Sequence, residues 1–471
     1  MTTVLPNQVP AGTDDADQTC GGPLLLLIAS GLLWLVLGGT LALLNLIQVY
    51  TPAFLADCAW LTYGRLQAMQ ETALLYGWAG NAGLAVALWV LARLGGAPLR
   101  GPNYIVAGGL FWNLGVTLAL VGIAVGDASG HGMFQLPRYV QPFLLFAFGA
   151  IAVPGVLAWT GRRNPTTYAA QWYAVAALFL FPWFFSVASV MLTFAPVRGT
   201  LQAVVATWYA QNVFSLWLAP VAIAAVYYLL PKITGRVIPS YDFAVYGFWS
   251  LLFFGCWMGG RLLVGAPVPA WVSTMAIANA WVVLFHHIIV FFNVRDVFRP
   301  GANTTLKFLA LGMGAYLLSA VIDTAFSARA LAVTTQFTHF QQAQTHLAMG
   351  AVALILTGAL YHMTPRLAGG NWPSVALIRA HFMAYIIGFV LLVGSLAVAG
   401  WIQGSALNDP SVAFTQIAAR TKVWLQLATA AQALLVVAHV LFAAHFFKLV
   451  GGQMAKCCAT RGILTSEATV S

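Results

Sequence analysis

Charge is scarce in this sequence. Asp, Glu, Lys and Arg make up 7% of its 471 residues, whereas a soluble globular domain carries roughly 25% charged residues. Hydrophobic residues make up 61%, and the mean hydropathy is +0.85. This composition excludes an ordinary soluble protein and indicates an integral membrane protein that lies in a lipid bilayer. The net charge of +10 is then expected from basic loops at the cytoplasmic surface, so we expect no nucleic-acid partner.

Other absences narrow the class further. Residues 1–22 are polar and lack the basic start of a cleavable signal peptide. The five cysteines form no zinc-type pattern, and the pair Cys457–Cys458 is interpreted as exposed thiols, with acylation as a further option. The sequence contains no phosphate-binding loop, no dinucleotide fingerprint and no zinc-protease motif. None of the nine histidines stands four residues from another, so no helical metal pair is expected.

Long apolar stretches are what the sequence does have. A membrane-spanning helix needs about 20 mostly apolar residues. Such stretches lie near residues 23–49, 72–93, 103–126, 138–160, 170–194, 203–230, 243–264, 271–294, 305–326, 344–364, 375–402 and 423–450. They predict an all-α membrane protein with a twelve-helix membrane domain over 23–450, a polar N-terminal tail at 1–22 and a cytoplasmic C-terminal tail at 451–471.

The basic residues divide unevenly between the two ends of this predicted bundle. One end collects Arg93, Arg100, Arg162, Arg163, Lys232, Arg236, Arg295, Arg299, Lys307, Arg366, Arg379, Lys448, Lys456 and Arg461. The other end has half as many. Because cytoplasmic loops are enriched in Lys and Arg, both termini are predicted to be cytoplasmic, in a bacterial-type inner membrane.

A few polar residues stand inside the apolar stretches. Arg261 is one of them, and a charge at membrane depth needs a partner, for which Glu71, Asp323 and backbone carbonyls are the candidates. His286 and His287 are neighbours, so they point about 100° apart on a helix and cannot easily share one metal. We interpret them mainly as hydrogen-bonding contacts between helices, and one of them could line a cavity.

Five stretches carry a resemblance to a known family. They are "YGRLQAMQETALLYGWAGNA" at 63–82, "TWYAQNVFSLW" at 207–217 with "YYLLPK" at 227–232, "IPSYDFAVYGFWSL" at 238–251, "GALYHMTPR" at 358–366 and "IRAHFMAYIIG" at 378–388. In these the chain resembles subunit I of the heme–copper oxidases, most closely the cbb-type cytochrome c oxidases, with nitric oxide reductase as a relative. The resemblance implies a twelve-helix bundle, a low-spin heme, a high-spin heme beside copper, and electrons supplied by cytochrome c.

The family's metal-ligand positions are mostly filled by other residues. Its low-spin heme histidine in the second helix corresponds to Gln70, and a copper histidine in the sixth helix corresponds to Gln211. In the seventh helix the two copper histidines correspond to Arg261 and Leu262, and the tyrosine corresponds to Gly265. Pro269 and Trp271 fall where the family has them and support this register.

The tenth helix normally supplies two heme histidines separated by one residue. Here only His346 is present, and counting back from "GALYH" leaves it one residue out of register with a heme position; a local slip would put Gln344 at the place of the first histidine. His346 is therefore the one heme-ligand candidate, with a merely polar role as the alternative. Amide oxygen is a poor ligand beside imidazole, and a protonated guanidinium has no lone pair to donate.

The pattern predicts a degenerate cytochrome c oxidase subunit I-like protein of a respiratory electron-transfer system. It would have no catalytic residues of its own, no copper and at most one heme b, and would act as an accessory or structural subunit, with cytochrome c-type subunits as partners, or as a binding protein. The alternative is an active heme-containing terminal oxidase or nitric oxide reductase-like enzyme with atypical ligands such as His286, His287 and His346. A transporter function has no positive signal beyond hydrophobicity.

Overall fold

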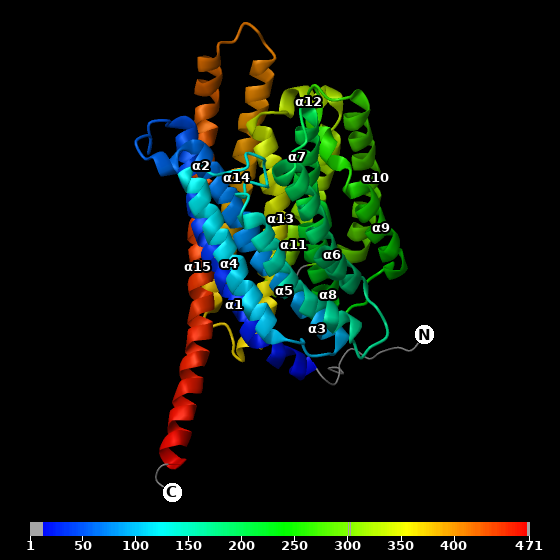
Figure 1. Cartoon of the computed structure of the whole chain (residues 1–471), viewed down its shortest axis with the longest axis vertical. Coiled ribbons are helices and arrows are strands. Elements are labelled where there is room, and N and C mark those ends of the chain that lie inside the picture. The colour runs from blue at the N-terminus through cyan, green and yellow to red at the C-terminus, as the bar shows by residue number, and fades with distance from the viewer. Residues whose placement is uncertain (1–12, 300, 302, 469–471) are drawn as a thin grey trace.

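The chain folds into a bundle of long, roughly parallel and antiparallel helices (Figure 1). This computed structural model describes residues 13–299, 301 and 303–468. The first helix starts at Thr13 and the last one continues to Ala468, so both extend into the segments predicted as polar tails. Residues 1–12 and 469–471 lie outside the described part, as do the side chains of Cys457 and Cys458.

Fifteen α-helices are described in residues 13–468. They are α1 (Thr13–Tyr50), α2 (Tyr63–Thr72), α3 (Asn81–Gly95), α4 (Pro102–Val125), α5 (Val140–Thr160), α6 (Ala169–Ser189), α7 (Thr200–Asn212), α8 (Ala219–Thr234), α9 (Ala244–Gly255), α10 (Ala270–Val294), α11 (Thr304–Phe326), α12 (Arg329–Thr335), α13 (His339–Ala368), α14 (Val375–Leu407) and α15 (Phe414–Ala468). Shorter 3₁₀ segments are η1 (Ala59–Leu61), η5 (Tyr241–Phe243), η6 (Met258–Leu263) and η7 (Arg295–Phe298). The π-helical segments η2 (Ala73–Gly80), η3 (Val190–Phe194) and η4 (Val213–Leu218) connect or extend their neighbours.

The predicted all-α membrane fold is confirmed. Within the described residues, 11 helical stretches are long and apolar enough to cross a membrane. Each covers one of the predicted spans, usually with ends that differ by a few residues. The π segments interrupt no helix: they lie within the continuous stretches 63–95, 169–194 and 200–234. A π-bulge adds one residue to a helical turn, and the chain continues in the same direction.

The predicted span 243–264 is not one continuous helix. α9 ends at Gly255, and the chain then turns into η6. A Cβ atom on Gly259 would stand 2.4 Å from the carbonyl oxygen of Thr207 in α7. The absence of a side chain at this glycine therefore allows the η6 backbone to pack directly against α7. Irregular backbone at membrane depth is tolerated where it is buried in protein or lines a cavity, and η6 meets both conditions.

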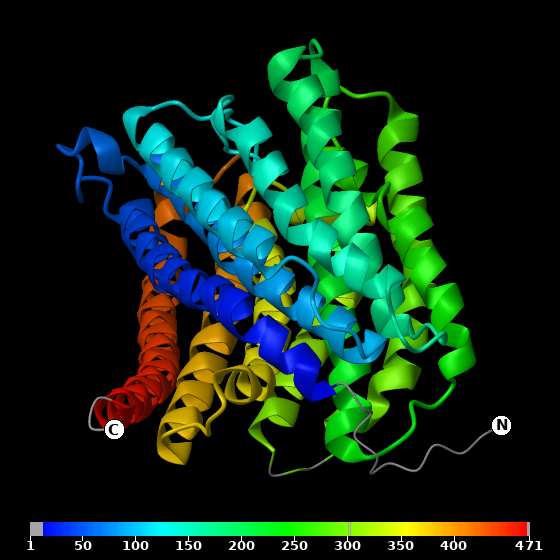
Figure 2. The same cartoon turned by 60° about the horizontal axis from the view of Figure 1, so that its bottom comes forward.

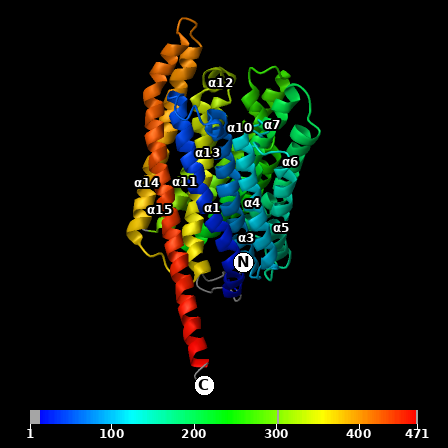
Figure 3. The same cartoon turned by 60° about the vertical axis from the view of Figure 1, so that its left-hand side comes forward.

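The helices alternate in direction through the bundle. α14 and α15 stand on one side and α9 and α10 on the opposite side (Figures 1 and 2). The hairpin between α14 and α15 rises above the other helices, whereas the end of α15 extends beyond them in the opposite direction (Figure 3). The start of α1 and the end of α15 lie toward the same end of the molecule. α3, α8 and α13 carry Arg93, Lys232 and Arg366 in their last turns, consistent with the predicted basic end.

Candidate functional site

An ion pair between a buried arginine and a partly exposed aspartate stands at the centre of the candidate site. Arg261, in η6, is buried, and its guanidinium faces the carboxylate of Asp323 near the end of α11. Nε donates to Oδ1 of Asp323 at 3.0 Å, and Nη2 donates to Oδ1 at 2.8 Å and to Oδ2 at 2.6 Å. Two-pronged Arg–carboxylate contacts of this kind are both strong and geometrically specific. Of the two carboxylates predicted as partners, Asp323 is therefore the one that pairs with Arg261.

The remaining donor nitrogen of Arg261 is also fully used. Nη1 donates to Oε1 of Gln211 and to the carbonyl oxygen of Met258, each at 2.7 Å. The hydrogen bonds to Asp323, Gln211 and Met258 together engage all three nitrogens of the guanidinium. Gln211 in turn donates from Nε2 to Oγ of Ser215, one helical turn further along, at 2.5 Å. The charge is thus neutralised and held in one orientation by groups from α7, η4, η6 and α11.

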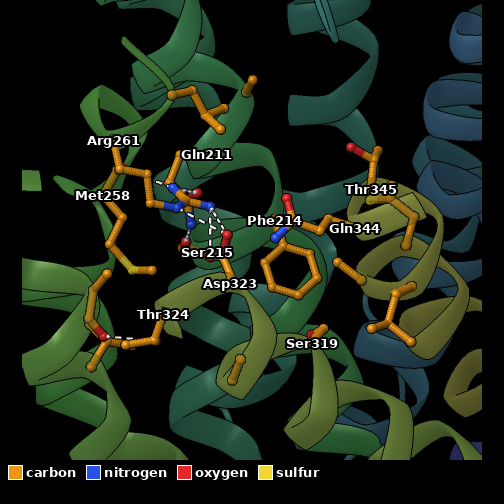
Figure 4. A pocket seen from close by; sticks show the side chains of 18 of the residues that line it. Gln211, Phe214, Ser215, Met258, Arg261, Ser319, Asp323, Thr324, Gln344 and Thr345 are labelled. Carbon is orange, nitrogen blue, oxygen red and sulfur yellow. Dashed lines mark hydrogen bonds and ion pairs between the residues drawn. The ribbon is translucent and has the colours of Figure 1, made fainter. Parts of the chain in front are cut away.

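A cavity of about 140 Å³ lies beside this ion pair. The residues of its wall lie between the loop that precedes α5 and the helix α13. Most of their side chains are apolar, and a few are polar. The wall is formed by Met133, Ala210, Gln211, Val213, Phe214, Ser215, Leu251, Met258, Arg261, Leu262, Ala280, Val283, His287, Tyr316, Ser319, Ala320, Asp323, Thr324, Gln341, Gln344, Thr345, Leu347, Ala348 and Met349. Figure 4 shows Gln344 reaching from α13 toward Arg261 and Asp323, with the ring of Phe214 between the two walls.

The structure brings four of the predicted site positions together. Gln211 and Arg261 are hydrogen-bonded to each other, and Leu262 and Gln344 line the same cavity. A second, smaller cavity shares Arg261, Leu262 and Gln344 and continues past the end of α11 toward α12. Gln211, Arg261 and Leu262, which the resemblance aligns with copper histidines, therefore surround one space together with Gln344.

Three other predicted positions lie apart from this cavity. Gly265 follows η6 in an exposed loop with a φ of +83°. The position that the resemblance aligns with the family's tyrosine therefore lies outside a helix. Gln70, in α2, donates to Oε1 of Gln67 at 2.7 Å and to Oδ1 of Asn45 at 3.3 Å. His346 is half-buried in α13, does not line the cavity, and forms no hydrogen bond with any described residue.

Glu71 is not the partner of Arg261. Its carboxylate accepts a hydrogen bond from the backbone N–H of Met133, in the loop between α4 and α5. Tyr76 donates to the carbonyl oxygen of the same Met133 at 2.7 Å and contacts the hydroxyl of Tyr209 at 2.6 Å. Because Met133 also lines the cavity, Glu71 and Tyr76 fasten the loop that covers one wall of it.

His286 and His287 differ in role. Nδ1 of His286 contacts the carbonyl oxygen of Gly247 at 2.8 Å and Nε2 contacts the hydroxyl of Tyr316 at 3.0 Å, so this ring joins helices as predicted. His287 bonds through Nδ1 to the carbonyl oxygen of Val283 at 2.9 Å and lines the cavity. Tyr316 and Ser215 were not predicted from the sequence. The available signal was the spacing of Ser215, which stands four residues after Gln211.

The side chains of this site do not suit the family's metals. In the cavity wall His287 is the single imidazole among the described residues, whereas copper and high-spin heme in this family depend on several. The described residues contain no group of three or more His, Cys, Asp or Glu placed to hold a metal ion. An engineered cavity of similar size, about 150 Å³, holds one benzene, so this space matches one ring and not the four linked pyrroles of a porphyrin.

Comparisons with known proteins agree on the family of the fold. The family described as "Cytochrome C and Quinol oxidase polypeptide I" matches residues 23–434. The cbb3-type cytochrome c oxidase subunit CcoN1 of Stutzerimonas stutzeri is 24% identical over 394 residues, covering 80% of this chain and 83% of that protein. Cytochrome c oxidase subunit 1 of Rhodobacter capsulatus is also 24% identical, over 79% of this chain and 73% of that one.

A solved structure shows the same architecture. A heme–copper terminal oxidase, determined by cryo-electron microscopy as a dimer, superposes with a TM-score of 0.71. The match covers 92% of this chain and 84% of that one at 14% sequence identity. At this identity the likeness establishes the arrangement of helices, and the chemistry of the site has to be inferred from its own residues.

Proposed function

The chain belongs to the cytochrome c and quinol oxidase polypeptide I family, and on that premise we propose that it is a degenerate subunit I. In this proposal the chain has lost the copper and high-spin heme site and acts as an accessory or binding subunit of a respiratory membrane complex. Its membrane is a bacterial-type inner membrane, and the basic end of the bundle, with both termini, faces the cytoplasm.

The observation that carries the proposal is the ion pair at the copper position. Arg261 stands where the family has a copper histidine, and it is hydrogen-bonded to Gln211, which stands where another copper histidine would be. A guanidinium cannot ligate a metal, and its positive charge opposes a copper ion at close range. The bidentate contact with Asp323 gives this charge a stable alternative role.

Heme and copper content tests the proposal. The protein would be purified from membranes under mild detergent, and its pyridine hemochrome spectrum and copper content would be measured on one preparation. We expect neither copper nor heme at a level comparable to the protein. One copper per chain, or one heme per chain with the spectral shift of a high-spin iron on carbon monoxide binding, would refute the degenerate assignment.

A second candidate, a protein with one low-spin heme, is favoured by one feature only. His346 carries an imidazole with no hydrogen bond to a described residue, so its ring is free to act as an axial ligand. A single heme without carbon monoxide reactivity, abolished in His346→Leu, would support this candidate and still leave the copper site lost.

A further inference from the structure

We propose that the cavity beside Arg261 binds a neutral compound of one six-membered ring with a hydroxyl donor, a phenol in chemical class, and that His287 accepts its hydrogen bond. This inference rests on the proposed function in one respect, since it requires a cavity that holds no heme or copper. It identifies a ligand class for that same space.

The size of the cavity limits the ligand to one ring. The space measures about 140 Å³, close to the roughly 150 Å³ of an engineered cavity that binds benzene. Phe214, Leu251, Met258 and Met349 supply apolar and polarizable surface in the wall. Methionine side chains and an aromatic ring pack well against the faces and edges of a bound ring.

The charge of the cavity argues against an anionic ligand. All three guanidinium nitrogens of Arg261 are hydrogen-bonded to Asp323, Gln211 or Met258. The guanidinium and the Asp323 carboxylate cancel each other, so a carboxylate or phosphate would have to break a bidentate ion pair to be recognised. A neutral ligand leaves that pair intact and avoids the cost of burying an uncompensated charge.

The free polar atoms of the cavity include hydrogen-bond acceptors. A carbonyl oxygen can only accept, so Nδ1 of His287 must donate to Val283 at 2.9 Å. In the neutral ring this leaves Nε2 with a lone pair. Nε2 has no hydrogen-bond partner among the described residues. It is not one of the fully buried polar atoms that lack a partner, so it is accessible from open space. Because His287 lines the cavity, this lone pair is available to a ligand that donates.

Tyr316 adds a second acceptor for the same reason. Nδ1 of His286 must donate to the carbonyl oxygen of Gly247, so the hydroxyl of Tyr316 donates to Nε2 of His286. The hydroxyl oxygen of Tyr316 then keeps a lone pair as an acceptor, and Tyr316 is one of the residues that line the cavity. Gln341 and Gln344 carry amides that serve donors and acceptors alike. The discrimination in favour of a hydroxyl compound therefore comes from His287 and Tyr316.

A binding series with three probes of similar size tests the inference. Phenol, toluene and benzoate would be titrated into the full-length protein in lipid nanodiscs, and binding measured by calorimetry. We expect phenol to bind about tenfold more tightly than toluene, equivalent to about 1.4 kcal/mol, and benzoate not to bind. His287→Phe should abolish the preference for phenol while toluene binding stays within about twofold, since only a hydrogen bond is lost. His287→Gln, which retains an acceptor, should restore part of the preference.

The matched control is His362→Phe. His362 is also half-buried, but it packs on Trp89 with ring centroids 6.0 Å apart and does not line the cavity, so this variant should keep the preference. Equal binding of phenol and toluene to the unaltered protein, an unchanged preference in His287→Phe, or tight benzoate binding would overturn the inference. Heme and copper are measured on the same preparation. Metal-loaded protein refutes the proposed function, whereas metal-free protein without a phenol preference refutes only this inference.

Discussion

Two regions that the resemblance aligns with metal-ligand positions differ in charge: one holds the charged side chain of Arg261, whereas the other holds the neutral amide of Gln70. Arg261 is buried and relies on Asp323, a residue 62 positions further along the chain, and on Gln211, 50 positions before it. Gln70 is half-buried and bonds to Gln67, three residues away, and to Asn45 on α1.

This difference predicts how each region responds to substitution. Removing one partner of a buried ion pair leaves an uncompensated charge, which costs far more than the intact pair contributes. Removing the half-buried amide of Gln70 leaves neutral groups on Gln67 and Asn45, which a water molecule or a neighbouring group can satisfy. The Arg261 region should therefore be sensitive to any single change, and the Gln70 region tolerant.

The largest effect is expected for Asp323→Asn. The substitution keeps the shape of the side chain but leaves the guanidinium of Arg261 without a counter-charge, at a cost of about 3–5 kcal/mol of unfolding free energy. Unfolding by denaturant in mixed micelles would measure it. The double variant Arg261→Met/Asp323→Leu removes both charges and should recover most of this loss, because a buried pair can often be replaced by apolar residues at little cost.

Arg236→Gln supplies the control for charge removal as such. Arg236 is more than half exposed, and its Nη1 lies 3.9 Å from Oδ2 of Asp296. Exposed pairs of this kind contribute about 0–1 kcal/mol. If Asp323→Asn lowered the unfolding free energy no more than Arg236→Gln does, the Arg261 ion pair would be no more shielded from water than an exposed pair.

A smaller difference is expected between Gln211→Leu and Gln70→Leu. The first removes an acceptor from a buried guanidinium N–H and should cost about 1–3 kcal/mol, whereas the second should cost about 0.5–1.5 kcal/mol. The changes in unfolding free energy of Gln211→Leu and Gln70→Leu should add in the double variant, because the two regions share no partner. Those of Gln211→Leu and Asp323→Asn should not add, because both residues bind Arg261. Chemical denaturation of the single and double variants measures these changes. Equal single costs, or coupling between Gln70 and Gln211, would contradict the separation of the two regions.

Much of the fold could be predicted from the sequence, because spans are set by hydropathy and length. The break after Gly255 could not, since "GCWMGGRLLVG" at 255–265 is as apolar as a continuous span and its separation from a helix depends on the approach of Thr207 to Gly259. Glycine at 255, 259 and 260 was the available signal. Hydropathy averages over such a stretch and does not detect a local backbone contact.

The site was predictable in its positions and less so in its contacts. The register through Pro269 and Trp271 placed Arg261, and its need for a partner limited the choice to a few groups. Choosing Asp323 over Glu71 required the tertiary structure, because both carboxylates lie in apolar spans and only the packing of η6 against α10 and α7 decides which one it meets. Gly265 does not line the cavity, because the chain leaves the helical conformation of α9 after Gly255.

The smallest effect is expected for His346→Phe. The ring makes no hydrogen bond with a described residue and is only half-buried, so the unfolding free energy should change by less than about 1 kcal/mol. His346 matters because it is the one heme-ligand candidate that the resemblance names. The visible absorbance of the purified variant, in the range where a bound heme absorbs through its porphyrin ring, should match that of the unaltered protein. If the substitution instead removed a heme band and lowered stability together, His346 would be a heme ligand, and the candidate with one low-spin heme would replace the cofactor-free one.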